Sequence, residues 1–269
     1  MKSSPKTGWL PLAWFGVFMV APMGILVAMS FATRGLYGRV EWTLTHENYL
    51  RLFDGLYLLI FAKSLGLAAA TTLLCLVLSI PLAWAIATRP ASQRLTWLIL
   101  LALPFMVNLI SRIYAIRGVL GYDGPLAFLG TWIAAVGAEW GLVLYGMVSS
   151  YLMFMFFPVY VAFEKFDYLQ IEAAQDLGAS SWTQLRRVIW PQLRKPVAAG
   201  SVMVFVPALG EFVIPDLLGG ARSMMAGGLV TEQFLKSRDW PFGAALAVVL
   251  VAIMIFFVGA FRRWGERES

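Results

Sequence analysis

Two acidic residues, Glu211 and Asp216, lie within the largely apolar segment PALGEFVIPDLLGG that begins at Pro207. An ionisable side chain at membrane depth is costly, so it usually faces a partner or a water-filled path. Prolines and glycines interrupt the same segment, and broken helices are tolerated where they line a cavity. We therefore expect both carboxylates to line a translocation path that favours a cation. Alternatively, one or both of them pair with Arg112 or lie in the outer headgroup region.

A second polar group lies near the outer end of another apolar run, at Asn108, Ser111, Arg112 and Tyr114. Arg112 either extends outward to the headgroups or pairs with one of the two acids and holds a gate. Aromatic rings can present cation–π faces to an amine, although they more often form the interfacial belt, and the candidates are Tyr114, Tyr122 and Trp132. Asn108, Arg112 and Tyr114 are therefore candidate path residues beside the acids.

The chain lacks the residue patterns of an enzyme. No Gly-x-x-x-x-Gly-Lys-Ser/Thr segment is present to cradle nucleotide phosphates, and no histidine dyad, serine elbow or cysteine pair supports catalysis. The single cysteine, Cys75, and the single histidine, His46, exclude intrachain disulfides and clusters of cysteine or histidine around a metal. We expect no catalytic residue, no metal and no cofactor on this chain, so ATP hydrolysis, if it drives the protein, belongs to another subunit.

Composition indicates an integral membrane protein. Of the 269 residues, 60% are hydrophobic and 13% are charged, and the mean hydropathy is +0.75. Apolar runs about as long as the roughly 20 residues that cross a bilayer occur at 7–33, 64–88, 95–116, 140–163, 197–221 and 241–261. Arg112 interrupts the third run, and Glu211 and Asp216 interrupt the fifth. The first run is longer than a signal-peptide core and other spans follow it, so we expect it to be retained. We expect one all-α membrane domain over residues 1–269, with about six transmembrane helices.

Two segments outside the spans have simple structural interpretations. Asp239 and Pro241 suit the start of the last span, because an acid favours the positive end of a helix and proline suits its first turn. The amphipathic segment from Thr45 to Phe53 is expected on the membrane surface before the second span.

Basic residues predict the orientation in the membrane. With the N-terminus inside, one side holds twelve lysines and arginines against six acids, so the whole net charge of +6 lies on that side. Loops rich in lysine and arginine remain in the cytoplasm, so we expect both termini and the polar loop 164–196 to be cytoplasmic. This asymmetry accounts for the positive charge without nucleic acid as a partner.

The polar loop contains the stretch DYLQIEAAQDLGASSWTQLRRVIWP, from Asp167 to Pro191. Asp167 and Gln170 predict a capping box, and Gly178 suits the left-handed residue that ends a helix. The apolar positions of this helix share one face, at Leu169, Ala173 and Leu177. Ser180 can cap a second helix, whose end we expect at Pro191 because proline cannot continue the backbone hydrogen bonding. Two short helices hinged at a glycine are typical of a segment that a partner binds.

This stretch resembles the coupling loop of permease subunits of binding-protein-dependent ABC importers. The family carries Glu-Ala-Ala, then a spaced glycine, then Ile-x-Leu-Pro, and the loop matches at Glu172, Ala173, Ala174, Gly178 and Pro191. Val188 replaces the isoleucine of the family pattern, which is a mild change. Trp190 replaces the leucine of the family pattern with a larger side chain. In the family this loop docks into a groove on the cytoplasmic ATPase. The resemblance implies that the ATPase contact is formed or shaped by Glu172, Ala173, Ala174, Asp176, Gly178 and Pro191.

Outer segments resemble, more narrowly, the spermidine/putrescine permeases. The matching segments are Arg112–Ala115, Gly210–Gly220 and Arg238–Pro241, and the resemblance covers about Asn48 to Arg262. The segment GYDGP at 121–125 departs from the Gly-x-x-Asn pattern of those permeases.

The resemblance implies a type I importer fold with a cytoplasmic coupling helix, in the bacterial inner membrane, with a polyamine as solute. It also implies a second homologous permease, two ATPase subunits that bind ATP and Mg, and a periplasmic solute-binding protein. An ABC importer permease for another small organic solute is the alternative. A stand-alone secondary transporter is a third interpretation, but such a carrier has no reason to possess the Glu-Ala-Ala loop.

Overall fold

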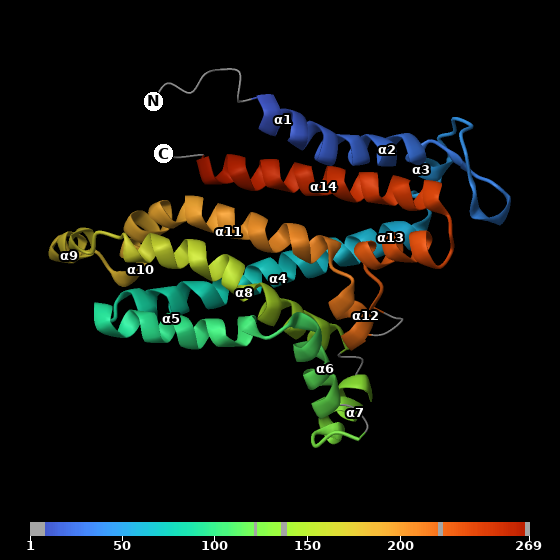
Figure 1. Cartoon of the computed structure of the whole chain (residues 1–269). Helices are drawn as coiled ribbons and strands as arrows, with labels where there is room; N and C mark the ends of the chain where they lie inside the picture. Colours follow the sequence, from blue (N-terminus) through green and yellow to red (C-terminus); the bar gives the residue numbers. More distant parts are fainter. Residues whose placement is uncertain (1–8, 121–122, 136–138, 220–222, 267–269) are drawn as a thin grey trace. The chain divides into compact units, whose positions relative to one another are not determined.

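Helices account for most of the residues described by the computed structural model, which are 9–120, 123–135, 139–219 and 223–266 (Figure 1). In order these helices are α1 (Trp9–Phe15), the π-helical turn η1 (Gly16–Val20), α2 (Ala21–Ser30), the 3-10 turn η2 (Leu36–Gly38), α3 (Glu47–Arg51), α4 (Gly55–Ala87), α5 (Ala91–Met106), α6 (Leu109–Leu120), α7 (Ala127–Ala135), α8 (Glu139–Glu164), α9 (Leu169–Asp176), α10 (Ser181–Gln184), the π-helical turn η3 (Leu185–Ile189), α11 (Trp190–Gly210), α12 (Val213–Gly219), α13 (Ala226–Leu235) and α14 (Trp240–Glu266). The strands β1 (Thr33–Arg34) and β2 (Val40–Glu41) form a small antiparallel hairpin. The all-α prediction is confirmed.

Four helices are long and apolar enough to cross a membrane, and two bent helix pairs raise the number of candidate spans to six. The four are Ala13–Ser30, Gly55–Ala87, Trp140–Glu164 and Trp240–Glu266. The bent pairs are α5 with α6, at 78°, and α10–α11 with α12, at 60°. The prediction of about six spans is confirmed, although the second helix begins at Gly55 rather than near Ser64.

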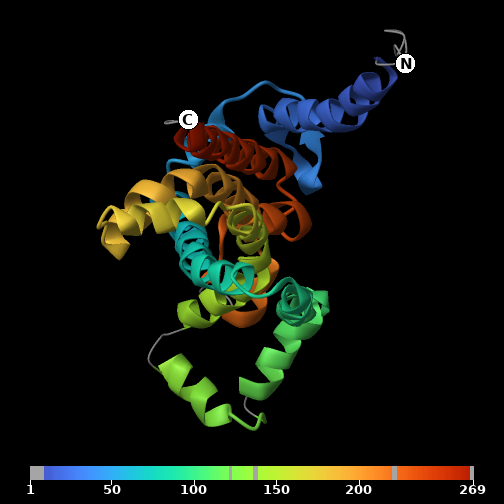
Figure 2. The same ribbon diagram turned by 90° about the vertical axis from the view of Figure 1, so that its left-hand side faces the viewer.

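The chain separates into two compact units: Met1–Phe61 with Ala226–Ile253, and Ala62–Met225 with Met254–Ser269. In the second unit, α8 packs along α11 and against α12, and the ribbons of α8 and α11 lie side by side in Figure 1 and Figure 2. The approach of α8 and α11 is close, because a Cβ on Gly200 would lie 2.7 Å from the Met155 sulfur. Buried apolar side chains such as Met147, Phe156 and Leu193 fill this core.

Both bent spans break where a polar residue replaces the regular helical bonding. The fifth span breaks after Gly210, as predicted, but Pro207 and Pro215 lie inside α11 and α12 rather than at the break. The third span breaks at Val107 and Asn108 rather than at Arg112, which lies inside α6. Gly220, which was expected to contribute to the interruption, lies outside the described residues.

In the first unit, polar contacts hold the segments that connect α2, α3 and α14. The buried Asn48 amide donates to the Ser30 and Ala32 carbonyls at the end of α2, at 2.9 and 2.8 Å. Asp239 accepts from the Phe242 N–H at the start of α14, so the predicted structural cap is confirmed. Its other oxygen lies 2.9 Å from the Arg51 guanidinium, which also stacks on the Phe242 ring at 3.9 Å.

Candidate functional site

The first helix of the polar loop is α9, and its two ends form largely as the sequence predicts. The Asp167 carboxylate accepts the Leu169 N–H at 3.1 Å. Gly178 adopts a φ of +75°, the left-handed conformation that glycine tolerates best after a helix. The Ser180 hydroxyl then accepts the Thr183 N–H at the start of α10. The predicted helix–glycine–helix hairpin is therefore confirmed.

Two details of this loop differ from the prediction. Gln170 does not close a capping box, because its side-chain oxygen accepts from Gln192 at 2.8 Å. Pro191 does not end the second helix, since the π-helical turn η3 leads directly into α11 and places Pro191 in its first turn. The proline is accommodated because the π-helical turn directly before it departs from the regular bonding of an α-helix. The second helix of the loop is thus continuous with the fifth span.

Three large apolar side chains of the loop are exposed. Leu169, Leu177 and Trp182 are 67%, 88% and 69% exposed. The motif positions Glu172, Ala173, Asp176, Gly178 and Pro191 are exposed as well, and Ala174 is half-buried. Large exposed apolar side chains near charged residues are expected on a surface that binds another protein.

The base of the loop is held by aromatic contacts. The Tyr168 hydroxyl donates to the Phe163 carbonyl at 3.1 Å, and burial raises the pKa of Tyr168, partly opposed by the positive charge of Arg94. The Trp190 ring meets the Trp264 ring edge-on, with centroids 6.1 Å apart. The large side chain that replaces leucine in the motif is therefore accommodated by a second tryptophan on α14.

Glu211 is the polar centre of the broken fifth span. One carboxylate oxygen accepts the N–H groups of Phe212, Val213 and Ile214, at 3.0, 2.9 and 3.4 Å. The other accepts the Tyr151 hydroxyl at 2.5 Å, and the residue is only 8% exposed. A carboxylate so placed caps α12 and stabilises its positive end. Tyr151 is the functional residue that sequence reasoning missed; the polar run Ser149–Tyr151 within an apolar span was the signal for it.

Among the described residues, no hydrogen bond or ion pair joins the remaining candidate path residues to Glu211. Asp216 lies on α12 with an exposed side chain. The Asn108 side chain accepts the Ile110 N–H at 2.9 Å and so caps α6. Arg112 donates to the Ser149 carbonyl at 3.0 Å, and the described part of the chain contains no ion pair of Arg112 with an acid.

Two of the three candidate aromatic residues are largely exposed. Tyr114 and Trp132 are 56% and 63% exposed. Tyr122 lies outside the described residues. Within the described ranges, no group of three or more histidine, cysteine, aspartate or glutamate side chains is arranged to hold a metal ion.

The chain has several apolar spans, and two of them break where a polar residue caps the helix that follows. An exposed two-helix loop continues into one of these broken spans. Together these features define a multi-pass membrane permease. The family model described as "Binding-protein-dependent transport system inner membrane component" matches residues 55–268, and the chain belongs to this family. Its members are transport components of the inner membrane.

Individual relatives agree with this assignment. The chain is 37% identical over 249 residues to the spermidine/putrescine transport system permease protein PotB of Escherichia coli (strain K12), covering 90% of each chain. It is 35% identical to PotB of Haemophilus influenzae, covering 91% of this chain and 88% of that protein.

The fold matches the solved structure of a bacterial alginate ABC transporter in complex with alginate pentasaccharide-bound periplasmic protein. The TM-score is 0.70 at 16% identity, covering 97% of this chain and 96% of the other. At that identity the likeness shows the fold alone, and the predicted type I importer permease fold is confirmed.

Proposed function

We propose that this chain is the permease subunit of an ATP-driven importer that carries a polyamine of the spermidine/putrescine class. The observation that carries the proposal is the direct helical path from the exposed loop through η3 and α11 to the break at Glu211. Such a path links a surface for a motor protein to a break in a span. The identity of over a third to the PotB proteins across 90% of the chain supports the solute class.

The partners in this proposal are those of a complete importer. A second homologous permease completes the path, two cytoplasmic ATPase subunits bind ATP and Mg, and a periplasmic binding protein delivers the solute. ATP hydrolysis resides on the ATPase subunits, and this chain contributes no catalytic group. Both termini and the loop 164–196 lie in the cytoplasm, in keeping with the excess of lysine and arginine on that side.

In the coupling step, α9 docks into the ATPase and moves with it. Glu172 and Asp176 are exposed and available to basic residues of the motor protein, while the small Ala173 and Ala174 permit close packing. Gly178 makes the turn to α10, and Pro191 lies where the loop enters α11. The movement of α9 thereby reaches the fifth span as that of a rigid lever.

Along the solute path, the two acids have different roles. Glu211 holds the shape of the break, because its oxygens are occupied by Tyr151 and by N–H groups of α12. Asp216 presents the exposed carboxylate that favours a cation over an anion. Asn108 and Arg112 shape the neighbouring break, and Tyr114 offers an exposed ring to an amine.

The test is ATP hydrolysis and uptake by the reconstituted assembly with its binding protein. Spermidine and putrescine are expected to stimulate both activities, whereas an acidic amino acid and a neutral sugar are not. If only the acidic amino acid or the neutral sugar stimulates these activities, the protein is still an importer, but its solute is not a polyamine. Uptake that proceeds without the ATPase subunits would instead point to a secondary transporter and refute the proposal.

Orientation has a separate test. Ser180→Cys places a thiol on the exposed loop, and the native Cys75 is buried, so an impermeant thiol reagent reports mainly on residue 180. Labelling is expected in inverted vesicles and not in intact cells. Labelling from outside intact cells would contradict the cytoplasmic placement.

A further inference from the structure

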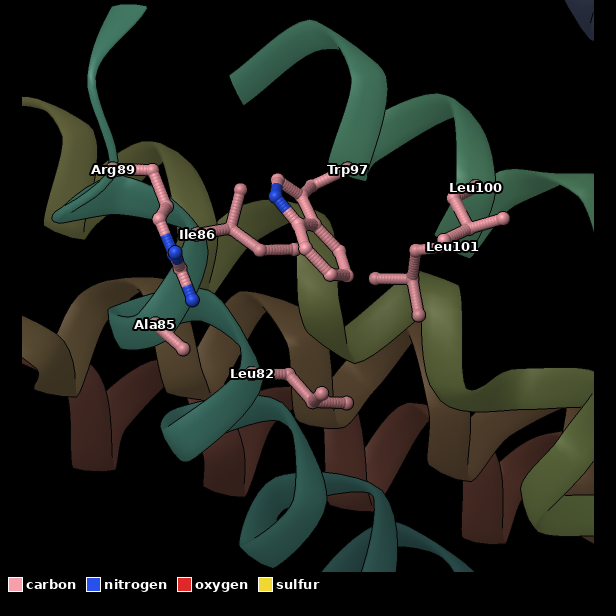
Figure 3. A pocket seen from close by; sticks show the side chains of 7 residues that line it. All are labelled: Leu82, Ala85, Ile86, Arg89, Trp97, Leu100 and Leu101. Carbon is pink, nitrogen blue, oxygen red and sulfur yellow. The ribbon is translucent and has the colours of Figure 1, made fainter. Parts of the chain in front are cut away.

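A cleft opens between the last turns of α4 and the first half of α5, within the second compact unit (Figure 3). Its volume is about 280 Å³. Its walls are mainly aliphatic and include Leu82, Ile86, Leu100 and Leu101. Two side chains with nitrogen atoms, Arg89 and Trp97, also line it. The cleft therefore combines an apolar interior with one cationic group.

Arg89 is free to bind an anion at this position. Its guanidinium lies 5.7 Å from the centre of the Trp97 ring, an exposed cation–π contact. In the part of the chain that the structure describes, Arg89 forms no ion pair with a carboxylate. The connecting residues 88–94 contain a second arginine and no acid.

The backbone beneath Arg89 is fixed by its neighbour. The Arg94 Nε donates to the Arg89 carbonyl at 2.7 Å, which closes the turn between α4 and α5. The turn therefore presents the Arg89 side chain at the rim of the cleft rather than leaving it on a free loop.

We propose that this cleft binds one phospholipid with an anionic headgroup from the cytoplasmic leaflet. The headgroup phosphate lies on Arg89, part of an acyl chain lies between α4 and α5, and the Trp97 indole lies at the level of the interface. Charge complementarity selects this occupant, because the rim carries Arg89 without an ion pair among the described residues, on the membrane side that the loop charges predict to hold the positive excess. The same charge repels a polyamine, so the cleft is separate from the solute path.

The experiment uses the complete transporter, with both permeases and the ATPase subunits, in detergent micelles. Native mass spectrometry measures the binding of phosphatidylglycerol and of phosphatidylcholine with identical acyl chains. We expect phosphatidylglycerol to bind about fivefold more tightly, the factor that corresponds to about 1 kcal/mol for one basic residue near a charged surface. Arg89→Gln should abolish that preference, and Arg89→Lys should retain it.

Two further variants separate the cleft from general surface charge. Ala85→Phe fills the cleft, since Ala85 is a lining residue, and should weaken both lipids. Arg262→Gln removes an exposed arginine predicted to lie on the same side, and should leave both affinities unchanged. Equal effects of Arg262→Gln and Arg89→Gln would refute the site, as would equal affinity of the two lipids. Soluble glycerol phosphate should not displace the lipid, and displacement by it would indicate a phosphate site without an acyl chain.

A second measurement needs no variant. Phosphatidylglycerol with a photoreactive group on its acyl chain is expected to label peptides within residues 82–101 of the unmodified transporter. Excess unlabelled phosphatidylglycerol should suppress that labelling. Absence of label in this range would refute the site.

Discussion

Replacing Tyr151 with phenylalanine removes one hydroxyl from the hydrogen bonds that surround Glu211. That hydroxyl donates to a carboxylate oxygen at 2.5 Å, in a place where Tyr151 is 9% and Glu211 is 8% exposed. The ring itself remains and keeps its contact with Phe154, at a centroid distance of 6.2 Å. The change therefore isolates one hydrogen bond to a buried charged group.

The expected loss of stability follows from the remaining partners. A hydrogen bond to a charged group contributes about 1.5–3 kcal/mol, and three backbone N–H groups still hold the other carboxylate oxygen. We expect Tyr151→Phe to lower the free energy of unfolding by about 2 kcal/mol. Chemical unfolding of the purified permease in mixed micelles measures this difference. The matched control is Tyr145→Phe, because Tyr145 lies on the same helix but is 59% exposed.

Transport separates a positioning role of Glu211 from direct solute contact. If Glu211 only stabilises the break between α11 and α12, Tyr151→Phe lowers the maximal rate of uptake and leaves the half-saturating solute concentration unchanged. A Tyr151→Phe protein as stable as the Tyr145→Phe control would refute the role assigned to this hydrogen bond. An unchanged stability with a shifted half-saturating concentration would place Glu211 in contact with the solute instead.

Other contacts give three further expected results. Gly178→Ala forces a left-handed φ on alanine, at a cost of about 1–2 kcal/mol, and should uncouple ATP hydrolysis from uptake in proteoliposomes without preventing insertion; normal uptake would count against the coupling role. Trp190→Leu removes the ring contact with Trp264 and should lower thermal stability by about 1 kcal/mol while transport continues, whereas lost transport would give this pair a coupling role. Asp239→Ala removes a helix cap and the partner of Arg51, so chemical unfolding should show a loss of about 2 kcal/mol, and a stability like that of the parent would show that neither contact matters.

The sequence predicted those features that depend on local residue chemistry. The left-handed turn at Gly178 and the caps at Ser180 and Asp239 follow from side chains and their immediate neighbours, and all three are present. The break in the fifth span was also predicted from the prolines and glycines near Glu211, although it follows Gly210 and both prolines lie inside helices.

The features that the sequence did not predict depend on residues far apart in the chain. Tyr151 reaches Glu211 across sixty positions, so no local pattern reveals that the carboxylate is occupied. Pro191 was expected to end a helix, but the π-helical turn η3 before it allows the chain to continue into α11. Trp190 is understood only with Trp264, which lies on another helix.

Helix α8 connects the two breaks of the second unit. Its Ser149 carbonyl accepts from Arg112 on α6, and its Tyr151 hydroxyl donates to Glu211 at the start of α12. These two contacts lie within one turn of α8, and α12 also packs against α6. We therefore expect a rotation of α8 that lengthens one of these bonds to change the geometry of the other. In the proposed coupling, where α11 carries the movement of the loop to Glu211, this turn of α8 is where that movement would reach the third span.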